Sequence, residues 1–416
     1  MNIVNSQFIK ELNEIRILTL VKNEGIISRI ELARRTKISK VAVSEIVNRL
    51  SEAGYIVEIG KGESTKKGGK RPTLLKLNPD NGFVVGIEIH SSHAKIALAN
   101  LNSEIIREEI VHFETGGTIV SVLPEITRCI DQIFSGNPKY KEKLISIGIG
   151  LPGFIDYEKG ELAFAVTLHG WVQHPLASVF SEKYKVPVVI ENDVNARTFG
   201  EHLLGAGKDT DHMVCIWLGE GIGGGVIVDG SLLRGRYGSA GEIGYIELGH
   251  HIANRSYFRN LYTNQHYFGD ILREQHLIDT IKMKLKHQLP EMDIQHFSLQ
   301  ELLDDRNETI SALVQEVLDE YAMLLATLCS DLIKTLNTSK IILCGSVVEY
   351  SDYLLEKCRD IVKQNMHNIP FQSTPIVVGE LKEEGCIKGV IAMALHVIFE
   401  PRLKNKSIRT ESIMTV

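Results

Sequence analysis

The stretch Leu218-Gly219-Glu220-Gly221-Ile222-Gly223-Gly224-Gly225 decides how the larger part of this chain is interpreted. It follows the apolar run 213–218, and its five glycines predict a turn whose backbone N–H groups close around a phosphate. Glu220 stands inside this turn. A carboxylate that faces a phosphate in a closed site costs on the order of several kcal/mol, so the stretch combines a phosphate-binding pattern with a residue that opposes phosphate.

Length and composition predict a soluble globular protein. The chain has 416 residues, of which 44% are hydrophobic, and this size favours two or three domains. No run approaches the roughly 18 apolar residues of a membrane span, and the first residues lack the apolar core of a signal peptide. The six cysteines form no closely spaced pair, which is typical of reduced thiols and not of a metal site. We therefore expect a cytoplasmic protein without a membrane partner.

Charge is distributed unevenly along the chain. Residues 1–80 carry a net charge of +6, whereas the remainder carries −12. A basic segment joined to an acidic body favours a nucleic-acid-binding domain, although chance clustering would give the same asymmetry.

Three helical patterns follow one another in this basic segment. The first covers 8–23. Ser28 caps the second, with Glu31 placed for a capping box, and Ser39 caps the third, which runs to Gly54. Two short helices joined by the tight turn 36–38 predict a helix-turn-helix motif, with residues 39–53 as the recognition helix.

Two strands, 55–59 and 73–77, flank a loop rich in glycine and lysine and predict a wing. The alternative is a plain three-helix bundle with a solvated basic hairpin, but capping, helix length, wing and charge together favour an operator DNA partner. The candidate DNA-binding residues are Ser28, Arg29, Ser39, Lys40, Val41, Ala42, Ser44, Glu45, Asn48 and Arg49 in the helices, and Lys66, Lys67, Gly69, Lys70 and Arg71 in the wing.

The body alternates strands and helices and is predicted to be α/β with two lobes. Asn192 and Asp193 follow the strand 187–190 at the start of a helix, where α/β sheets place ligands. Their amide and carboxylate suit vicinal hydroxyls, and in a kinase Asp193 would also accept the proton of the attacking hydroxyl. Glu242 adds a carboxylate in the glycine-rich turn 238–244. The alternatives are a simple helix cap for Asn192 and Asp193 and a solvated side chain for Glu242.

Taken together, these motifs resemble those of the ROK family (repressors, open reading frames, kinases), with the N-terminal third most similar to xylose-repressor-like members. The resemblance implies a winged helix-turn-helix domain over 1–80 and an actin-like, sugar-kinase-like body. The first lobe would cover 81–195, completed by a helix at about 388–402, and the second lobe, with a dimerisation surface, 196–387. The motifs that carry it are the winged helix, 86–88, 148–153, Trp171, Asn192-Asp193, 218–225, 241–244 and 343–345.

The resemblance also implies a homodimer or dimer of dimers and a sugar site. The residues that match this site or border it are Gly153, Trp171, Asn192, Asp193, Glu242 and Tyr245. Trp171 would form a wall of the site or else belong to the core. Tyr245 replaces a histidine that the family uses for both zinc and sugar, so it would donate a hydroxyl or stack on the sugar instead.

The chain departs from the kinases of the family at three places. ROK kinases carry a hydroxyl residue where Glu220 stands here, and a Gly-Gly-Thr-type loop where this chain reads Glu88-Ile89-His90-Ser91-Ser92-His93. The zinc-binding histidine is lost, and no cysteine lies between Cys215 and Cys329. The sequence therefore predicts neither a cofactor nor a metal.

Downstream, the polar, helix-prone segment 250–304 has few family landmarks. A metal site rebuilt from its histidines is less favoured than a surface or packing role for them. The histidines concerned are His250, His251 and His266.

The resulting expectation is a cytoplasmic, sugar-responsive regulator, not an enzyme. It would repress a carbohydrate-utilisation operon, such as one for xylose, and be released by a sugar bound between the lobes. One alternative is an ATP-dependent sugar kinase with a DNA-binding domain. The other is a DNA-binding dimer that responds to no ligand.

Overall fold

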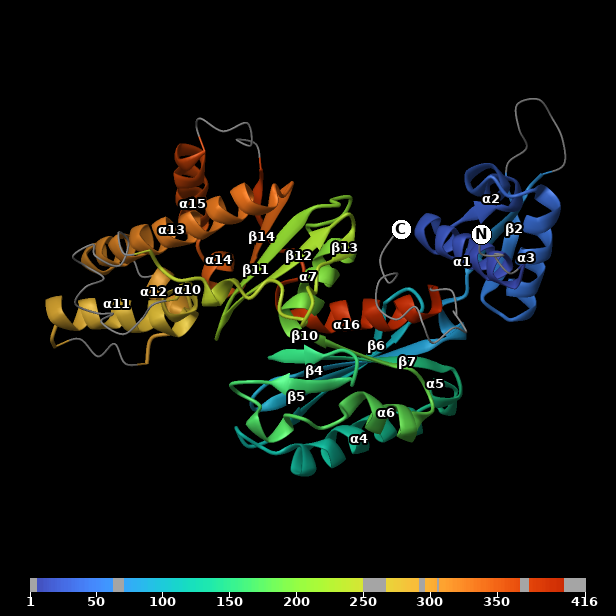
Figure 1. Cartoon of the computed structure of the whole chain (residues 1–416), viewed down its shortest axis with the longest axis horizontal. Helices are drawn as coiled ribbons and strands as arrows, with labels where there is room; N and C mark the ends of the chain where they lie inside the picture. The colour runs from blue at the N-terminus through green and yellow to red at the C-terminus, as the bar shows by residue number, and fades with distance from the viewer. Residues whose placement is uncertain are drawn as a thin grey trace. The chain divides into compact units, whose positions relative to one another are not determined.

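The computed structural model describes residues 6–62, 71–249, 267–291, 296–304, 307–366 and 374–399. The chain forms two compact units (Figure 1). The first unit comprises Met1–Glu191 and Val390–Met414, and the second comprises Asn192–Gly389 with the last two residues. The winged-helix region, called the head below, belongs to the first unit, so a separate head domain over 1–80 stays a prediction.

The head contains three helices and a small antiparallel sheet. The helices are α1 (Ser6–Glu24), α2 (Arg29–Thr36) and α3 (Lys40–Glu52), and the strands are β1 (Ile27–Ser28), β2 (Ile56–Lys61) and β3 (Thr73–Leu77), in the order β1-β3-β2. Ser28 Oγ accepts from Glu31 N and Ser39 Oγ accepts from Ala42 N, each at 3.2 Å. Both predicted N-caps and the helix-turn-helix they begin are therefore confirmed.

A short connector joins the head to the rest of the first unit. It is the 3₁₀ turn η1 (Pro79–Asn81), and its Asn81 Nδ2 donates to Ala53 O, beyond the last turn of α3, at 2.9 Å. Lys143 Nζ donates to Asn81 Oδ1, also at 2.9 Å. Asn78 Nδ2 donates to Gly54 O at 3.0 Å, so the end of the recognition helix is bound to the connector by side-chain hydrogen bonds.

A five-stranded sheet of order β10-β7-β4-β5-β6 forms the centre of the first unit. Its strands are β4 (Phe83–Ile89), β5 (His93–Asn100), β6 (Ile105–His112), β7 (Leu144–Leu151) and β10 (Val188–Asn192). Around it lie α4 (Ile119–Ser135), α5 (Pro138–Glu142), α6 (Leu176–Tyr184), the turn η2 (His169–Trp171) and the hairpin β8 (Phe154–Asp156) with β9 (Glu161–Phe164). Every residue of β4 is buried, as expected for a central strand that is parallel to β7 and antiparallel to β5.

The second unit has a sheet of order β13-β12-β11-β14-β15. Its strands are β11 (Met213–Leu218), β12 (Ile222–Val228), β13 (Ser231–Leu232), β14 (Lys340–Cys344) and β15 (Ile376–Val378). Its helical elements are α7 (Asp193–Leu204), η3 (Ile243–Tyr245), α10 (Phe268–Ile271), α11 (Glu274–Gln288), α12 (Leu299–Asp304), α13 (Glu308–Leu336), α14 (Ser346–Glu349), α15 (Asp352–Asn365) and η4 (Lys382–Glu384).

Two C-terminal elements complete the list, α16 (Gly385–His396) and η5 (Val397–Phe399). The second half of α16 belongs to the first unit, where Ser146 Oγ donates to Ala394 O at 2.6 Å. The helix that the sequence predicts at about 388–402 corresponds to α16 with η5. All six cysteines are free thiols, and all are buried.

The glycines of the opening stretch do not form one phosphate turn. Only 219–221 lie in a turn, whereas Gly223, Gly224 and Gly225 lie in β12 and pair with β11. A Cβ atom on Gly223 would approach Val194 Cγ2 to 2.7 Å, and one on Gly225 would overlap Thr198. Both partners lie on α7, so the prediction of a single glycine turn is wrong: Gly223 and Gly225 are required because α7 packs directly on the backbone of β12.

Gly225→Ala is expected to lower the free energy of unfolding by about 1–3 kcal/mol, because the new methyl group overlaps buried Thr198. Gly221→Ala is the matched control from the same stretch, since no atom lies within 4 Å of its Cβ position. Its stability should stay within about 0.5 kcal/mol of the parent. Urea unfolding followed by circular dichroism checks both, and equal midpoints for the two variants would contradict the packing role.

Candidate nucleic-acid interface and ligand site

Helix α3 presents a polar outer face. Its buried residues, Val43, Ile46, Val47 and Leu50, recur at helical spacing and anchor it in the head. Of the predicted DNA-binding residues here, Ala42 and Ser44 are half-buried, and those that are exposed are Ser39, Lys40, Val41, Glu45, Asn48 and Arg49.

Arg29 fixes the orientation of this helix. Its guanidinium donates to Asn48 Oδ1 at 2.8 Å and to Ser44 O at 3.4 Å, and it pairs with Glu58 Oε1 of β2 at 3.0 Å. Arg49 pairs with Glu14 of α1. The structure therefore gives Arg29, Asn48 and Arg49 partners inside the head, a positioning role that sequence reasoning missed because the partners are distant in the chain.

The two wing strands are present. β2 and β3 pair antiparallel, and Lys61 Nζ donates to Thr73 Oγ1 at 2.7 Å. Arg71 is exposed at the edge of the wing, and within the described head it has no hydrogen-bond or ion-pair partner. Lys66, Lys67, Gly69 and Lys70 lie outside the described residues.

Asn192 and Asp193 form the N-terminus of α7. Asn192 Oδ1 accepts from the backbone N–H groups of Val194 and Asn195, both at 3.0 Å, and so caps the helix. Asp193 Oδ1 accepts from Val194 N at 2.9 Å. The helix-cap alternative therefore holds for Asn192, and the cap holds both side chains at the positive end of the helix dipole.

Glu242 is the second carboxylate of this region. It is half-buried and directly precedes η3. Burial raises the pKa of its carboxyl above the usual value of 4.5, and the negative charge of Asp193 raises it further. The two carboxylates therefore lie close enough to repel each other, an arrangement that hydroxyl donors of a sugar would stabilise.

Tyr245 is 55% exposed, and its ring lies edge-on to Tyr267 with 6.1 Å between the ring centroids. Tyr267 follows a long stretch without periodicity, so no sequence pattern signalled it. An exposed aromatic pair beside a half-buried carboxylate offers an apolar face and hydroxyl groups to a ligand.

Gly153 and Trp171 lie in the first unit. Trp171 is fully buried, and its Nε1 donates to Gly117 O at 2.8 Å, which supports the core alternative for this residue. Gly153 has a φ of +116°, and a Cβ there would overlap Phe164 O. Local backbone packing therefore explains why glycine stands at this position.

In each of the two turns, 90–93 and 219–221, one backbone N–H group bonds within the turn. His90 N donates to His93 O at 2.8 Å, and the two imidazole rings stack with 4.3 Å between centroids. Gly219 N donates to Gly221 O at 3.2 Å, and Glu220 is exposed beside it. Neither of these N–H groups is directed to a ligand.

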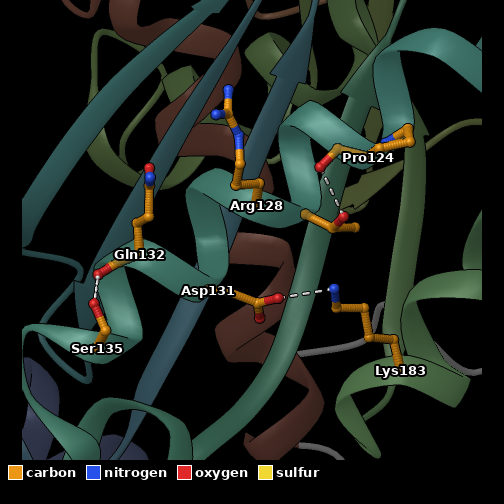
Figure 2. Close-up of a pocket in the computed structure, with 7 residues that line it drawn as sticks. Pro124, Arg128, Asp131, Gln132, Ser135 and Lys183 are labelled. Atoms are coloured by element: carbon orange, nitrogen blue, oxygen red, sulfur yellow. Dashed lines mark hydrogen bonds and ion pairs between the residues drawn. The ribbon is translucent and has the colours of Figure 1, made fainter.

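A groove on the first unit lies between α4 and α6 (Figure 2). Asp131 and Lys183 face each other across it and pair at 2.8 Å. None of its lining residues belongs to the predicted set: they are Pro124, Thr127, Arg128, Asp131, Gln132, Ser135 and Lys183.

The described residues contain no group of three or more His, Cys, Asp or Glu side chains that could hold a metal ion. His250, His251 and His266 lie outside them. No helix in the described part of the chain is long and apolar enough to cross a bilayer.

Comparison with known proteins gives two family matches, the ROK family over residues 84–266 and the MarR family over residues 11–63. The chain is 28% identical over 398 residues to the xylose repressor of Caldicellulosiruptor bescii, covering 94% of this chain and 97% of that one. It is 35% identical over 253 residues to the xylose repressor of Bacillus subtilis, covering 60% and 63%. It is 24% identical over 386 residues to the DNA-binding transcriptional dual regulator NagC of Escherichia coli, covering 92% of each.

Among solved structures, a ROK family transcriptional regulator that is a homolog of the E. coli MLC protein matches with a TM-score of 0.78 at 20% identity, covering 94% of this chain and 97% of that one. A ROK family glucokinase from Streptomyces griseus, solved with glucose and AMPPNP, matches with a TM-score of 0.59 at 21% identity, covering 75% and 99%. At these identities the matches establish the fold. The glucokinase match covers three quarters of this chain, whereas the regulator match covers nearly all of it.

Glu242→Gln is expected to stabilise the protein at neutral pH. The pKa of the carboxyl is raised on folding, so its charged form is disfavoured in the folded state. This penalty is full above the raised pKa and disappears below the unfolded value of 4.5. The thermal midpoint of the variant should therefore exceed that of the parent at pH 8, and the difference should vanish at pH 4. A difference that grows as the pH falls would contradict this assignment.

Proposed function

We propose that this chain is a ROK-family repressor that leaves its operator when a sugar binds. The ROK match over residues 84–266, the MarR match over residues 11–63, the similarity to xylose repressors and the ligand region around α7 support the proposal. The proposal depends on one observation: the same chain contains a capped recognition helix and the Asn192, Asp193 and Glu242 cluster. We further propose a cytoplasmic homodimer or dimer of dimers on a palindromic operator, because paired heads match paired half-sites.

In this proposal α3 enters the major groove and the wing holds the DNA backbone or minor groove. The N-terminal half of α3 is exposed and carries short polar side chains that can reach base edges. Arg29 supports this role indirectly, because its bonds to Asn48 and Glu58 keep the helix at a fixed angle to the wing. Lys66, Lys67, Gly69, Lys70 and Arg71 are the proposed wing contacts.

The sugar would bind in the region of Asn192, Asp193, Glu242 and Tyr245. Two interacting carboxylates accept hydrogen bonds from neighbouring hydroxyls, and an exposed tyrosine covers the apolar side of a pyranose. The relatives are named for xylose and N-acetylglucosamine, so both sugars belong in any panel of candidate effectors.

An effector acts only through its difference in affinity for two states of the protein. Asn81 could couple the head to the first lobe, because it bonds both to Ala53 O at the end of α3 and to Lys143 of that lobe. A coupling of about 3 kcal/mol along such a route would change operator affinity roughly 150-fold.

The proposal includes the absence of kinase activity. In each of the two turns described above, one backbone N–H group bonds within the turn, and Glu220 would face the phosphate with a like charge. Incubation with radiolabelled ATP and a sugar panel should give no phosphorylated sugar above background. Turnover would instead favour a sugar kinase with a DNA-binding domain.

Fluorescence anisotropy on DNA from beside the protein's own gene, titrated with pentoses, hexoses and amino sugars, tests the repressor itself. One sugar should release the parent protein. Asp193→Asn should bind the DNA with unchanged affinity but require at least tenfold more sugar for release, because a carboxylate acceptor is lost. Asp131→Asn, in the groove of Figure 2, is the control and should respond like the parent. Tight binding that no sugar changes would favour the ligand-independent dimer.

Arg71→Ala should weaken operator binding and reduce the slope of log K against log salt by about one unit for each lost phosphate contact. Arg128→Ala is the matched control, because this arginine is also exposed but lies on α4, far along the chain from the head. Anisotropy between 50 and 200 mM salt measures both slopes (a range over which such contacts change affinity by orders of magnitude). An unchanged slope for Arg71→Ala would mean that this arginine contacts no phosphate.

A further inference from the structure

We infer that Val41 recognises the 5-methyl group of a thymine in each operator half-site. Val41 is the second residue of α3, and 71% of its surface is exposed. The inference rests on the proposed function, because it assigns one base contact to the proposed recognition helix.

Packing in the head does not account for this side chain. Val41 is the most exposed large hydrophobic residue of the described head. The others have between 38% and 56% of their surface exposed; they are Ile9, Ile26, Ile30, Val57 and Ile59. Valine is also a poorer helix former than alanine, by about half a kcal/mol. An exposed valine in the first turn of α3 therefore contributes nothing to the core of the head and lowers helix stability slightly, and what distinguishes Val41 is its place on the proposed recognition helix.

The neighbours of Val41 define the surface that it belongs to. Asn48 is bonded to Arg29, and Arg49 is paired with Glu14. Within the described head, Lys40, Val41 and Glu45 make no side-chain hydrogen bond or ion pair. Val41 and Glu45 are four residues apart and lie on the same face of the helix.

The chemistry of this face indicates which part of the DNA it meets. The carboxylate of Glu45 is repelled by phosphates, whereas it can accept a hydrogen bond from the N4 amino group of cytosine. The face that holds Val41 and Glu45 is therefore suited to base edges and not to the backbone. On the major-groove edges of the four base pairs the only apolar group is the thymine methyl, and an isopropyl side chain such as that of Val41 contacts it without requiring a hydrogen bond.

The test uses the full-length protein and a duplex that it selects from random DNA. Each thymine of that duplex is replaced in turn by uracil, which removes the methyl group and leaves every hydrogen-bonding group in place. At one thymine per half-site the dissociation constant should rise about fourfold, as expected for one buried methyl group. All other replacements should have smaller effects.

Val41→Ala supplies the second side of a double-mutant cycle. It should weaken binding to the thymine duplex by about the same factor as the uracil replacement and should not weaken binding to the uracil duplex further. Val41→Thr keeps the shape of the side chain but replaces a methyl group with a hydroxyl, and it should behave in the same way. Val120→Ala, at a valine of α4 that is 76% exposed, is the control and should bind both duplexes like the parent.

Two failures are distinguishable. If the parent binds the selected duplex tightly and no uracil replacement changes the dissociation constant, the inference about Val41 is overturned while the repressor proposal stands. If selection yields no preferred sequence and the protein does not bind DNA tightly, the proposed function itself fails, and the inference fails with it.

Discussion

The close approach of helix α7 to backbone on two of its sides is the constraint on which the second unit depends. On one side lies β12, where a Cβ atom on Gly225 would overlap Thr198. On the other side lies the first half of α16, where a Cβ on Gly389 would overlap Ala196 O and one on Gly200 would lie 2.7 Å from Gly385 O. Contacts of this kind leave no room for side chains, so α7 has little freedom to shift. Asn192 and Asp193 begin this helix, and their positions are set by its packing.

The packing of α7 explains glycines in β12 without any phosphate-binding role. In β12, Gly223 and Gly225 are needed for the packing of α7 whether or not a nucleotide binds, so their presence is no evidence for kinase activity. The turn before them is different, because Glu220 is exposed and Gly221 has open space around it. A turn residue can therefore change from a hydroxyl to a carboxylate without disturbing the helix or the strand.

Local signals in the sequence were sufficient for the head. Ser28 and Ser39 cap their helices through atoms three residues away, so the pattern that predicted them contains the whole interaction. Gly223 and Gly225 were misinterpreted because their partners, Val194 and Thr198, lie nearly thirty residues earlier in the chain. Glycine-rich sequence indicates either a turn or close backbone contact, and only the position of α7 distinguishes them.

Contacts between residues that are distant in the chain also limited the prediction of the site residues. Arg29 was expected to contact DNA. In the structure it bonds to Asn48 of α3 and Glu58 of β2, and no local sequence pattern could indicate these partners. Trp171 was left between a sugar wall and the core, because an aromatic residue in an irregular segment carries no periodicity. Its burial and its bond to Gly117 depend on the tertiary fold.

The arginines of the head also indicate how affinity and specificity are divided. Residues 1–80 contain six arginines, and four of them form ion pairs within the head: Arg29, Arg34, Arg35 and Arg49. Exposed pairs of this kind contribute about 0–1 kcal/mol to stability, so their main effect is to orient side chains and to neutralise charge next to α3. Arg16 donates to Thr36 O, which leaves Arg71 of the wing as the arginine without a partner in the described head.

Phosphate binding depends on cations that are not already neutralised, whereas base recognition depends on a helix held at a fixed angle. The internal pairs neutralise the arginines of α2 and α3 and fix α3. Among the arginines, nonspecific affinity should therefore come chiefly from the wing, and sequence recognition from the first turns of α3. A head built in this way can lose one wing cation and bind every sequence more weakly by a similar factor. The loss of a base-reading side chain on α3 would instead change the preferred sequence, because the phosphate contacts that position the head would remain.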